Sequence, residues 1–177
     1  MQKKMTTRQM AVAGMMGAIA IILGATGLGM FPIPNLTGRA TIMHVPVILA
    51  AVLEGPVVGA ITGLIFGVYS FLTPTGAIPA DPIVRILPRV LIGITAYYSY
   101  RALRRKPVLG LAMAGIVGTL TNTIGYLGLA VLLKYINIYV ALAAFPQASV
   151  ELVIATVLTV ILGKALKGIK KTAKEDE

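Results

Sequence analysis

Long apolar stretches alternate with short polar or Pro/Gly-rich breaks along almost the whole chain. The pattern predicts six membrane-spanning helices, at about residues 8–30, 40–53, 57–72, 82–103, 108–133 and 146–169. A helix needs roughly 20 apolar residues to cross a bilayer, and four of these stretches reach that length. Residues 40–53 and 57–72 are shorter, so they should tilt little, thin the bilayer or pack inside the bundle. We therefore expect an all-α integral membrane bundle that forms a single domain over residues 1–177.

The breaks between the stretches differ in character. Glu54-Gly55-Pro56 is a tight turn, whereas Phe31–Arg39 and Thr73–Asp81 are longer and rich in Pro and Gly, which prevents a continuous helix. These two loops are expected to face outward and to act as lids over a binding site. Lys134–Phe145 is a further outer segment, of no clear shape.

Basic residues gather in three clusters, which bears on topology. Most of the 16 Lys and Arg residues lie near the N-terminus, in one short link and in the tail. The members are Lys3, Lys4, Arg8, Arg101, Arg104, Arg105, Lys106, Lys164, Lys167, Lys170, Lys171 and Lys174. Even numbers of spans between clusters put all three on one face, which predicts both termini in the cytoplasm. The net charge of +10 then reflects topology and attraction to an anionic inner leaflet, and not nucleic-acid binding.

Composition excludes several classes of function. The chain is 57% hydrophobic and has no Cys, which rules out thiolate metal sites, disulfides and Cys nucleophiles. A single His makes a His-based metal site improbable, and no catalytic set of side chains emerges, so we expect no metal and no enzyme. The phosphate-cradling pattern Gly-x-x-x-x-Gly-Lys-Ser/Thr is absent, so this chain needs no cofactor and energy from ATP must come from a partner.

Apart from members of the three basic clusters, three charged residues fall inside predicted spans. Arg85 and Arg89 lie one helical turn apart, and Glu151 lies near the start of the last span. Charges within a membrane generally face a cavity or a partner. Arg85 either snorkels to the outer surface or joins a site. Arg89 either pairs with Glu151 or binds an anionic ligand group through its planar fork.

Uncharged polar residues suggest the rest of a binding site. Asn122 and Tyr126 share one helix face, where they either bind the hydroxyls and amides of a small ligand or bond between helices. His44 either lines the pocket, senses pH or sits at the membrane interface. Asp81, directly before a proline, is either a site residue or a helix cap.

Small residues repeat at four-residue spacing in two spans, which lets another helix approach closely. In the first span the strip consists of Ala13, Gly14, Gly17 and Ala18. It serves either packing within the bundle or docking of a separate membrane subunit. In the third span the series is Gly59, Gly63 and Gly67, for which we expect internal packing.

Four stretches, in their order along the chain, resemble the substrate-binding S components of energy-coupling factor (ECF) vitamin transporters. They are Ala40–Leu49, Glu54–Gly67, Leu87–Gly93 and Gly118–Thr123. The resemblance implies a six-helix bundle in a prokaryotic cell membrane, without ATPase activity. It further implies docking on a module of one transmembrane T subunit and two cytoplasmic ATPases, through the small residues Ala13, Gly14, Gly17 and Ala18.

Within that family, the His-Val-Pro, Pro-Arg-Val-Leu-Ile-Gly and Thr-Asn-Thr segments look most like the pantothenate type. Pantothenate has a carboxylate, which Arg85 or Arg89 would bind. It also has hydroxyls and an amide, which Asn122 and Tyr126 would bind. A riboflavin or folate ring would favour aromatic stacking, and the chain has no Trp and only 6% aromatic residues. Thiamine, which is cationic, would need more acid than Glu151. A stand-alone secondary carrier and a small membrane enzyme or assembly factor are the rival classes.

Overall fold

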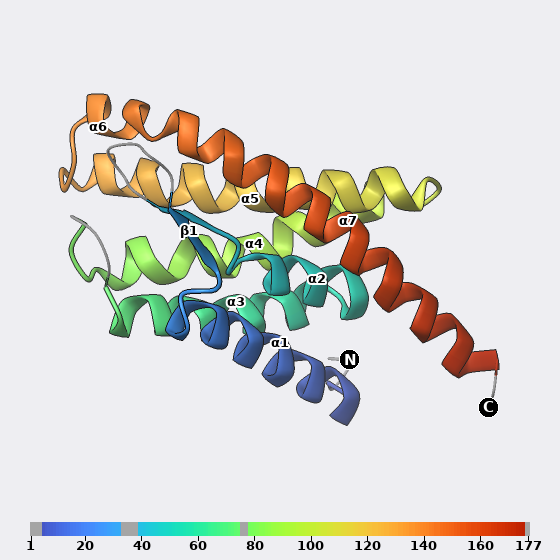
Figure 1. Ribbon diagram of the computed structural model, residues 1–177. Coiled ribbons are helices and arrows are strands. Elements are labelled where there is room, and N and C mark those ends of the chain that lie inside the picture. Colours follow the sequence, from blue (N-terminus) through green and yellow to red (C-terminus); the bar gives the residue numbers. More distant parts are fainter. Residues whose placement is uncertain (1–4, 33–38, 75–77, 176–177) are drawn as a thin grey trace.

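The computed structural model describes residues 5–32, 39–74 and 78–175, and within these ranges it is almost entirely helical (Figure 1). The elements in chain order are α1 (Thr7–Ala25), β1 (Met30–Pro32), β2 (Arg39–Thr41), α2 (Val45–Glu54), α3 (Pro56–Leu72), α4 (Pro82–Ala102), α5 (Pro107–Leu132), α6 (Ile138–Ala143) and α7 (Phe145–Glu175). The expected all-α architecture is confirmed. The two short strands pair antiparallel, with Met30 opposite Thr41.

The helices form an elongated bundle (Figure 1). The helix α3 packs along α4, α4 along α5, and α5 along α7, while α1 lies against α2 and α3. The short helix α2 contacts all five of the longer helices. It therefore forms the centre around which the others are arranged.

The sequence of α2 explains its central place. All eight residues of Val45–Val52 are buried, and they are apolar on every face. A helix that is apolar all round is stable only where it is covered on all sides. For the short span predicted at residues 40–53, the structure shows packing inside the bundle, which is one of the three alternatives. The first residues of that predicted span belong to β2 and not to the helix.

Glycines bring α3 and α4 into backbone contact. A Cβ atom added at Gly59 would lie 2.9 Å from the Cα of Gly93, and one at Gly63 would collide with the backbone of Arg89. Gly67 similarly faces Ile86. The expected internal packing of this series is confirmed, with α4 as its main partner. The backbone of α4, and with it Arg89, is thereby held at a distance that only glycine permits.

Three helices in the described ranges have both the length and the apolar character to cross a membrane unaided: α1, α5 and the Phe145–Gly168 part of α7. Shorter apolar helices are α2 and α3. Large apolar side chains such as Met15, Ile124 and Leu132 are 60–73% exposed on the outside of the bundle. So much exposed apolar surface is typical of a lipid-facing shell.

The helix ends differ in places from the predicted spans. The helix α1 ends at Ala25, before the residue 30 expected from the apolar run, because the chain turns at Gly27 with a positive φ of 74° and enters β1. The outer segment of no predicted shape, residues 134–145, contains α6. The predicted lid loops lie partly outside the described residues, at 33–38 and 75–77.

The two ends of the bundle carry different elements. Figure 1 places the start of α1, the turn between α2 and α3, the link between α4 and α5 and the C-terminal part of α7 toward one end. The hairpin of β1 and β2 and the helix α6 lie toward the other end. The described segments that carry the three basic clusters therefore lie toward one end of the molecule.

Candidate functional site

Arg85 is fixed inside the protein by backbone carbonyl groups. Its side chain is only 2% exposed, so it does not snorkel to the surface. Its Nε donates to the carbonyl oxygen of Pro79 at 3.1 Å, and its Nη atoms donate to those of Ser70 at 3.2 Å and Ile78 at 2.6 Å. Arg85 thus ties the end of α3 and the connection that follows it to the first turn of α4, which is a positioning role.

Arg89, one turn further along α4, keeps part of its hydrogen-bonding capacity free. It is 7% exposed, and its Nη1 donates to the carbonyl oxygen of Val84 at 3.0 Å. Its buried Nε has no partner within the described part of the protein. The guanidinium carbon lies 4.6 Å from the ring centre of Tyr126 and 5.8 Å from that of Phe66. A cation held over aromatic faces with an unused donor is suited to an anionic group.

Glu151 contacts the hairpin and does not pair with Arg89. Its Oε1 accepts from the backbone N–H of Thr41 at 2.7 Å and from Nε2 of Gln147 at 3.2 Å. No salt bridge joins Glu151 to Arg89 in the described ranges, so the structural ion pair considered for these two residues is not formed. The carboxylate instead links β2 to α7, and no counter-ion in the described part of the chain is bonded to the guanidinium of Arg89.

Four further buried side-chain atoms have no hydrogen-bond partner among the described residues, and two of them belong to the predicted site residues Asn122 and His44, the others being the hydroxyl oxygens of Thr156 and Thr159. Asn122 is 8% exposed, and its Oδ1 accepts no hydrogen bond from the described residues. His44 is fully buried, so it does not sit at the membrane interface. Its Nε2 lies 2.9 Å from Oγ1 of Thr119, while its Nδ1 has no described partner. Buried polar atoms are rarely left unsatisfied, and each such atom is a candidate for a ligand contact.

Asp81 caps a helix at the edge of this region. Its Oδ1 accepts from the backbone N–H groups of Ile83 at 2.8 Å and Val84 at 3.1 Å, and its Oδ2 accepts from the hydroxyl of Tyr135 at 2.9 Å. The bond from Val84 is the largest cause that lowers the pKa of Asp81 below its ordinary value of 3.8. The same carboxylate raises the pKa of Tyr135, because the phenol proton is held in the bond. Asp81 is therefore placed as the cap that the sequence offered as an alternative.

The sequence-predicted residues are brought together only in part. Arg89 and Tyr126 are in direct contact, and Asn122 lies one turn from Tyr126 on α5. His44 reaches the same helix through Thr119, one turn before Asn122. Glu151 and Asp81 do not join this group, because their carboxylates accept hydrogen bonds elsewhere, from Thr41 and Tyr135 among others. Within the described ranges, no three His, Asp or Glu side chains come together in a way that could hold a metal ion.

Some partners were not identified from the sequence. Phe66 lies beside Arg89 but belongs to an apolar run that gives no sign of it. The backbone N–H of Thr41 carries no side-chain signal at all. Gln147 stands one turn before Glu151, a spacing that marks a helical pair and was available in the sequence.

The strip of small residues on α1 divides between two faces. Ala13 and Gly17 are buried, and a Cβ atom at Gly17 would lie 2.8 Å from Cγ2 of Ile65. Gly14 and Ala18 are exposed, and a Cβ atom at Gly14 would meet nothing within 4 Å. Only the second pair is available to another subunit, so a bulky residue at Gly17 would disturb packing within the bundle.

A family model, a curated relative and solved structures match this chain. The family model for the substrate-specific component of ECF transporters matches residues 8–163. The pantothenic acid transporter PanT of Lactococcus lactis subsp. cremoris (strain MG1363) is 30% identical over 154 residues, covering 72% of this chain and 78% of PanT. A solved S component of a bacterial ECF transporter is 26% identical with a TM-score of 0.68, covering 93% of this chain and 98% of its own. The solved ThiT of Listeria monocytogenes, 16% identical, shares the fold with a TM-score of 0.68 and covers 92% of this chain and 95% of its own.

Proposed function

This chain belongs to the family of substrate-specific components of ECF transporters, and from that premise we propose that it captures pantothenate outside the cell for import. As a member of the family it is a protein of the prokaryotic plasma membrane and not an enzyme. One observation carries the choice of an anionic substrate: the buried guanidinium of Arg89 lies over Tyr126, and among the described residues no carboxylate is bonded to it and its Nε has no acceptor. The likeness to a pantothenic acid transporter supports the choice of vitamin.

The chemistry of pantothenate matches the unsatisfied groups. Its carboxylate would accept a hydrogen bond from Nε of Arg89, and such a bond is stronger when donor and acceptor are both charged. Its hydroxyls or amide N–H would donate to Oδ1 of Asn122, and a further polar contact is open at Nδ1 of His44. The ring of Tyr126 would keep the guanidinium in place and exclude water. Glu151 would act indirectly, by holding β2 beside the site.

The proposed topology has six spans and both termini in the cytoplasm. The helices α1 to α5 and α7 would be the spans, with short α2 enclosed by the others. The gathering of the basic residues at one end supports this orientation, because positive residues favour the cytoplasmic side. The chain has no Cys, so single cysteines added at either terminus can be labelled without interference. Labelling of the two termini from opposite sides of the membrane would refute the topology.

Import would depend on partner subunits. A transmembrane T subunit would dock on the exposed small residues Gly14 and Ala18 of α1, since small residues let helices approach closely. Two cytoplasmic ATPase subunits would supply the energy, and substrate binding by this chain alone would need no nucleotide. Uptake that persists in cells lacking the ATPase subunits would identify a stand-alone carrier instead.

Native mass spectrometry of the purified chain tests the choice of substrate. We expect a co-purified small molecule with the mass of pantothenate, which added isotope-labelled pantothenate replaces with a corresponding increase in the mass of the complex. A riboflavin, folate or thiamine mass in its place would keep the capture function and change the vitamin. The Arg89→Ala variant serves as the control, because it should purify folded and empty.

A further inference from the structure

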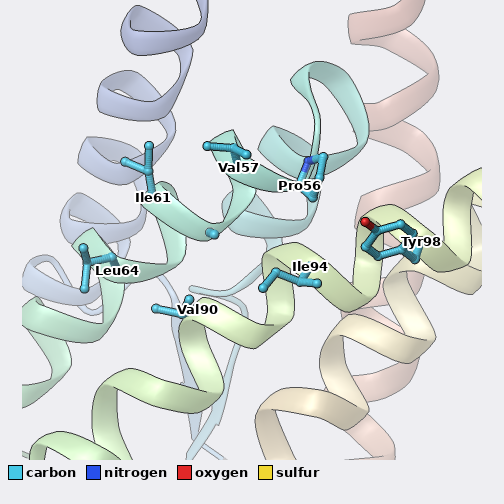
Figure 2. A pocket seen from close by; sticks show the side chains of 8 residues that line it. Pro56, Val57, Ile61, Leu64, Val90, Ile94 and Tyr98 are labelled. Atoms are coloured by element: carbon cyan, nitrogen blue, oxygen red, sulfur yellow. The ribbon is translucent and has the colours of Figure 1, made fainter. Parts of the chain in front are cut away.

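An apolar groove runs along the outside of the molecule between α3 and α4, separate from the polar residues around Arg89 (Figure 2). The aliphatic side chains of Val57 and Leu64 from α3 line one wall, and those of Val90 and Ile94 from α4 line the other. The small side chain of Ala60 also lines the groove and leaves room in it. Val57 is 58% exposed, so the groove opens to the surroundings of the bundle.

A basic hollow continues the groove at one end. Tyr98, 56% exposed, lines both the groove and a second hollow, which is otherwise formed by Arg101, Ala102 and Arg104. Both arginines are exposed. The two hollows together make a path that is aliphatic along its length and positively charged at the end of α4.

The length of the groove matches one leaflet of a bilayer. It extends from Leu64 to Pro56 along α3 and from Val90 to Tyr98 along α4. Each of these stretches corresponds to a helical rise of about 12 Å. The hydrocarbon core of a bilayer is about 30 Å thick, so the groove covers most of one leaflet. Arg101 and Arg104 line the hollow that follows this apolar length, at the end of α4.

We propose that this path is a binding site for one anionic phospholipid, with an acyl chain in the groove and the phosphate against Arg101 and Arg104. Basic pockets between membrane helices on the cytoplasmic side hold anionic head groups in this way, and an amphipathic Tyr suits the interface. Placing the site in the inner leaflet rests on the topology proposed above.

The walls of the groove favour a lipid chain over a partner helix. Helix–helix contacts in membranes use small residues that let two backbones approach, as Gly14 and Ala18 would on α1. Here Val57 and Leu64 stand out from the surface on one side of the groove. They leave space for a thin acyl chain but keep a second helix, roughly 10 Å wide, away from the backbone.

The test uses the full chain, stripped of lipid in a neutral detergent, and native mass spectrometry of its complexes with added phosphatidylglycerol or phosphatidylcholine. We expect retention of phosphatidylglycerol over phosphatidylcholine. The double variant Arg101→Gln/Arg104→Gln should weaken phosphatidylglycerol retention on the order of tenfold. The matched control Arg105→Gln/Lys106→Gln removes the same charge from exposed positions outside the hollow and should change little. Equal loss in both double variants, or equal retention of both lipids, would overturn the proposal.

A second pair of variants tests the groove itself. Ala60→Leu should fill it and reduce lipid retention, whereas Gly128→Leu should not, because a Cβ atom at Gly128 meets nothing within 4 Å. If Ala60→Leu retained as much phosphatidylglycerol as Gly128→Leu, the acyl chain could not lie in the groove, and that part of the proposal would be refuted. A photo-reactive residue at Val57 that captures a protein in the assembled transporter would assign the groove to a subunit. Pantothenate binding by the same variants should be unchanged, so failure of the substrate proposal would be seen separately.

Discussion

Replacing Gly63 by Ala tests the claim that glycine contact between α3 and α4 sets the position of Arg89. A Cβ atom at Gly63 would collide with the carbonyl oxygen of Arg89 and lie 2.8 Å from its carbonyl carbon and 3.1 Å from the Cα of Val90. These are backbone atoms, so no side-chain rotation relieves the contact. The two helices must separate, and the backbone that carries Arg89 moves with α4.

The expected magnitude follows from two opposing effects. A Gly-to-Ala change inside a helix normally stabilises by about 1 kcal/mol. Overpacking of a close contact costs about 1–3 kcal/mol. Gly63→Ala should therefore be neutral to destabilised by about 2 kcal/mol, while the control Gly128→Ala, with open space around its new methyl group, should be stabilised. In a chain of this size 1 kcal/mol corresponds to roughly 2–4 °C in Tm.

The assay is thermal unfolding of both purified variants in one detergent, combined with calorimetric titration of pantothenate. We expect Gly63→Ala to melt below Gly128→Ala by several degrees and to bind pantothenate more weakly than the wild-type chain, because the guanidinium of Arg89 shifts relative to Tyr126. Equal melting of the two glycine variants, with unchanged affinity, would refute the reasoning.

Three further predictions concern single side chains. Asn122→Leu should lower pantothenate affinity roughly tenfold in a calorimetric titration, without loss of Tm, because it removes an acceptor that no described residue satisfies. A lower Tm with unchanged affinity would contradict this. Asp81→Asn should lower Tm at neutral pH, and the difference from wild type should shrink as the pH falls below 3.8. The reason is that a carboxylate with a lowered pKa stabilises the fold only while it is ionised. A difference in Tm that does not depend on pH would exclude the charge of Asp81 as its cause. Gly14→Leu should leave pantothenate binding intact but stop uptake by cells that contain the partner subunits, because the leucine would cover the exposed docking strip; normal uptake would remove Gly14 from that strip.

The sequence predicted the parts of the fold that depend on periodic patterns. The glycines of α3 repeat every four residues, and one helix face follows directly from that spacing. The apolar runs predicted most of the helices, because the length and composition of an apolar run are visible in the sequence itself. The strip on α1 shows the limit of this reasoning: Gly14 and Gly17 look alike in sequence, but one is exposed and the other contacts Ile65.

The site was predicted less completely, because its contacts join distant segments through backbone atoms. Glu151 binds the N–H of Thr41, which lies 110 residues away and has no side-chain role in the bond. Arg85 binds carbonyl groups of the irregular segment before α4, where no period guides prediction. Sequence reasoning placed both charged residues within predicted spans, and considered the outer surface or a binding site for Arg85 and an ion pair with Arg89 for Glu151. Their actual partners could be seen only in the folded chain.

The central claim is that this chain binds an anionic vitamin through Arg89 without help from nucleotide. Its most direct test is calorimetric titration of pantothenate into the purified chain, with the Arg89→Ala variant measured alongside. We predict saturable binding at one site per chain in the absence of ATP, and no measurable binding by the folded variant. Equal binding by the two proteins, or no binding by a folded wild-type chain freed of endogenous ligand, would contradict the account.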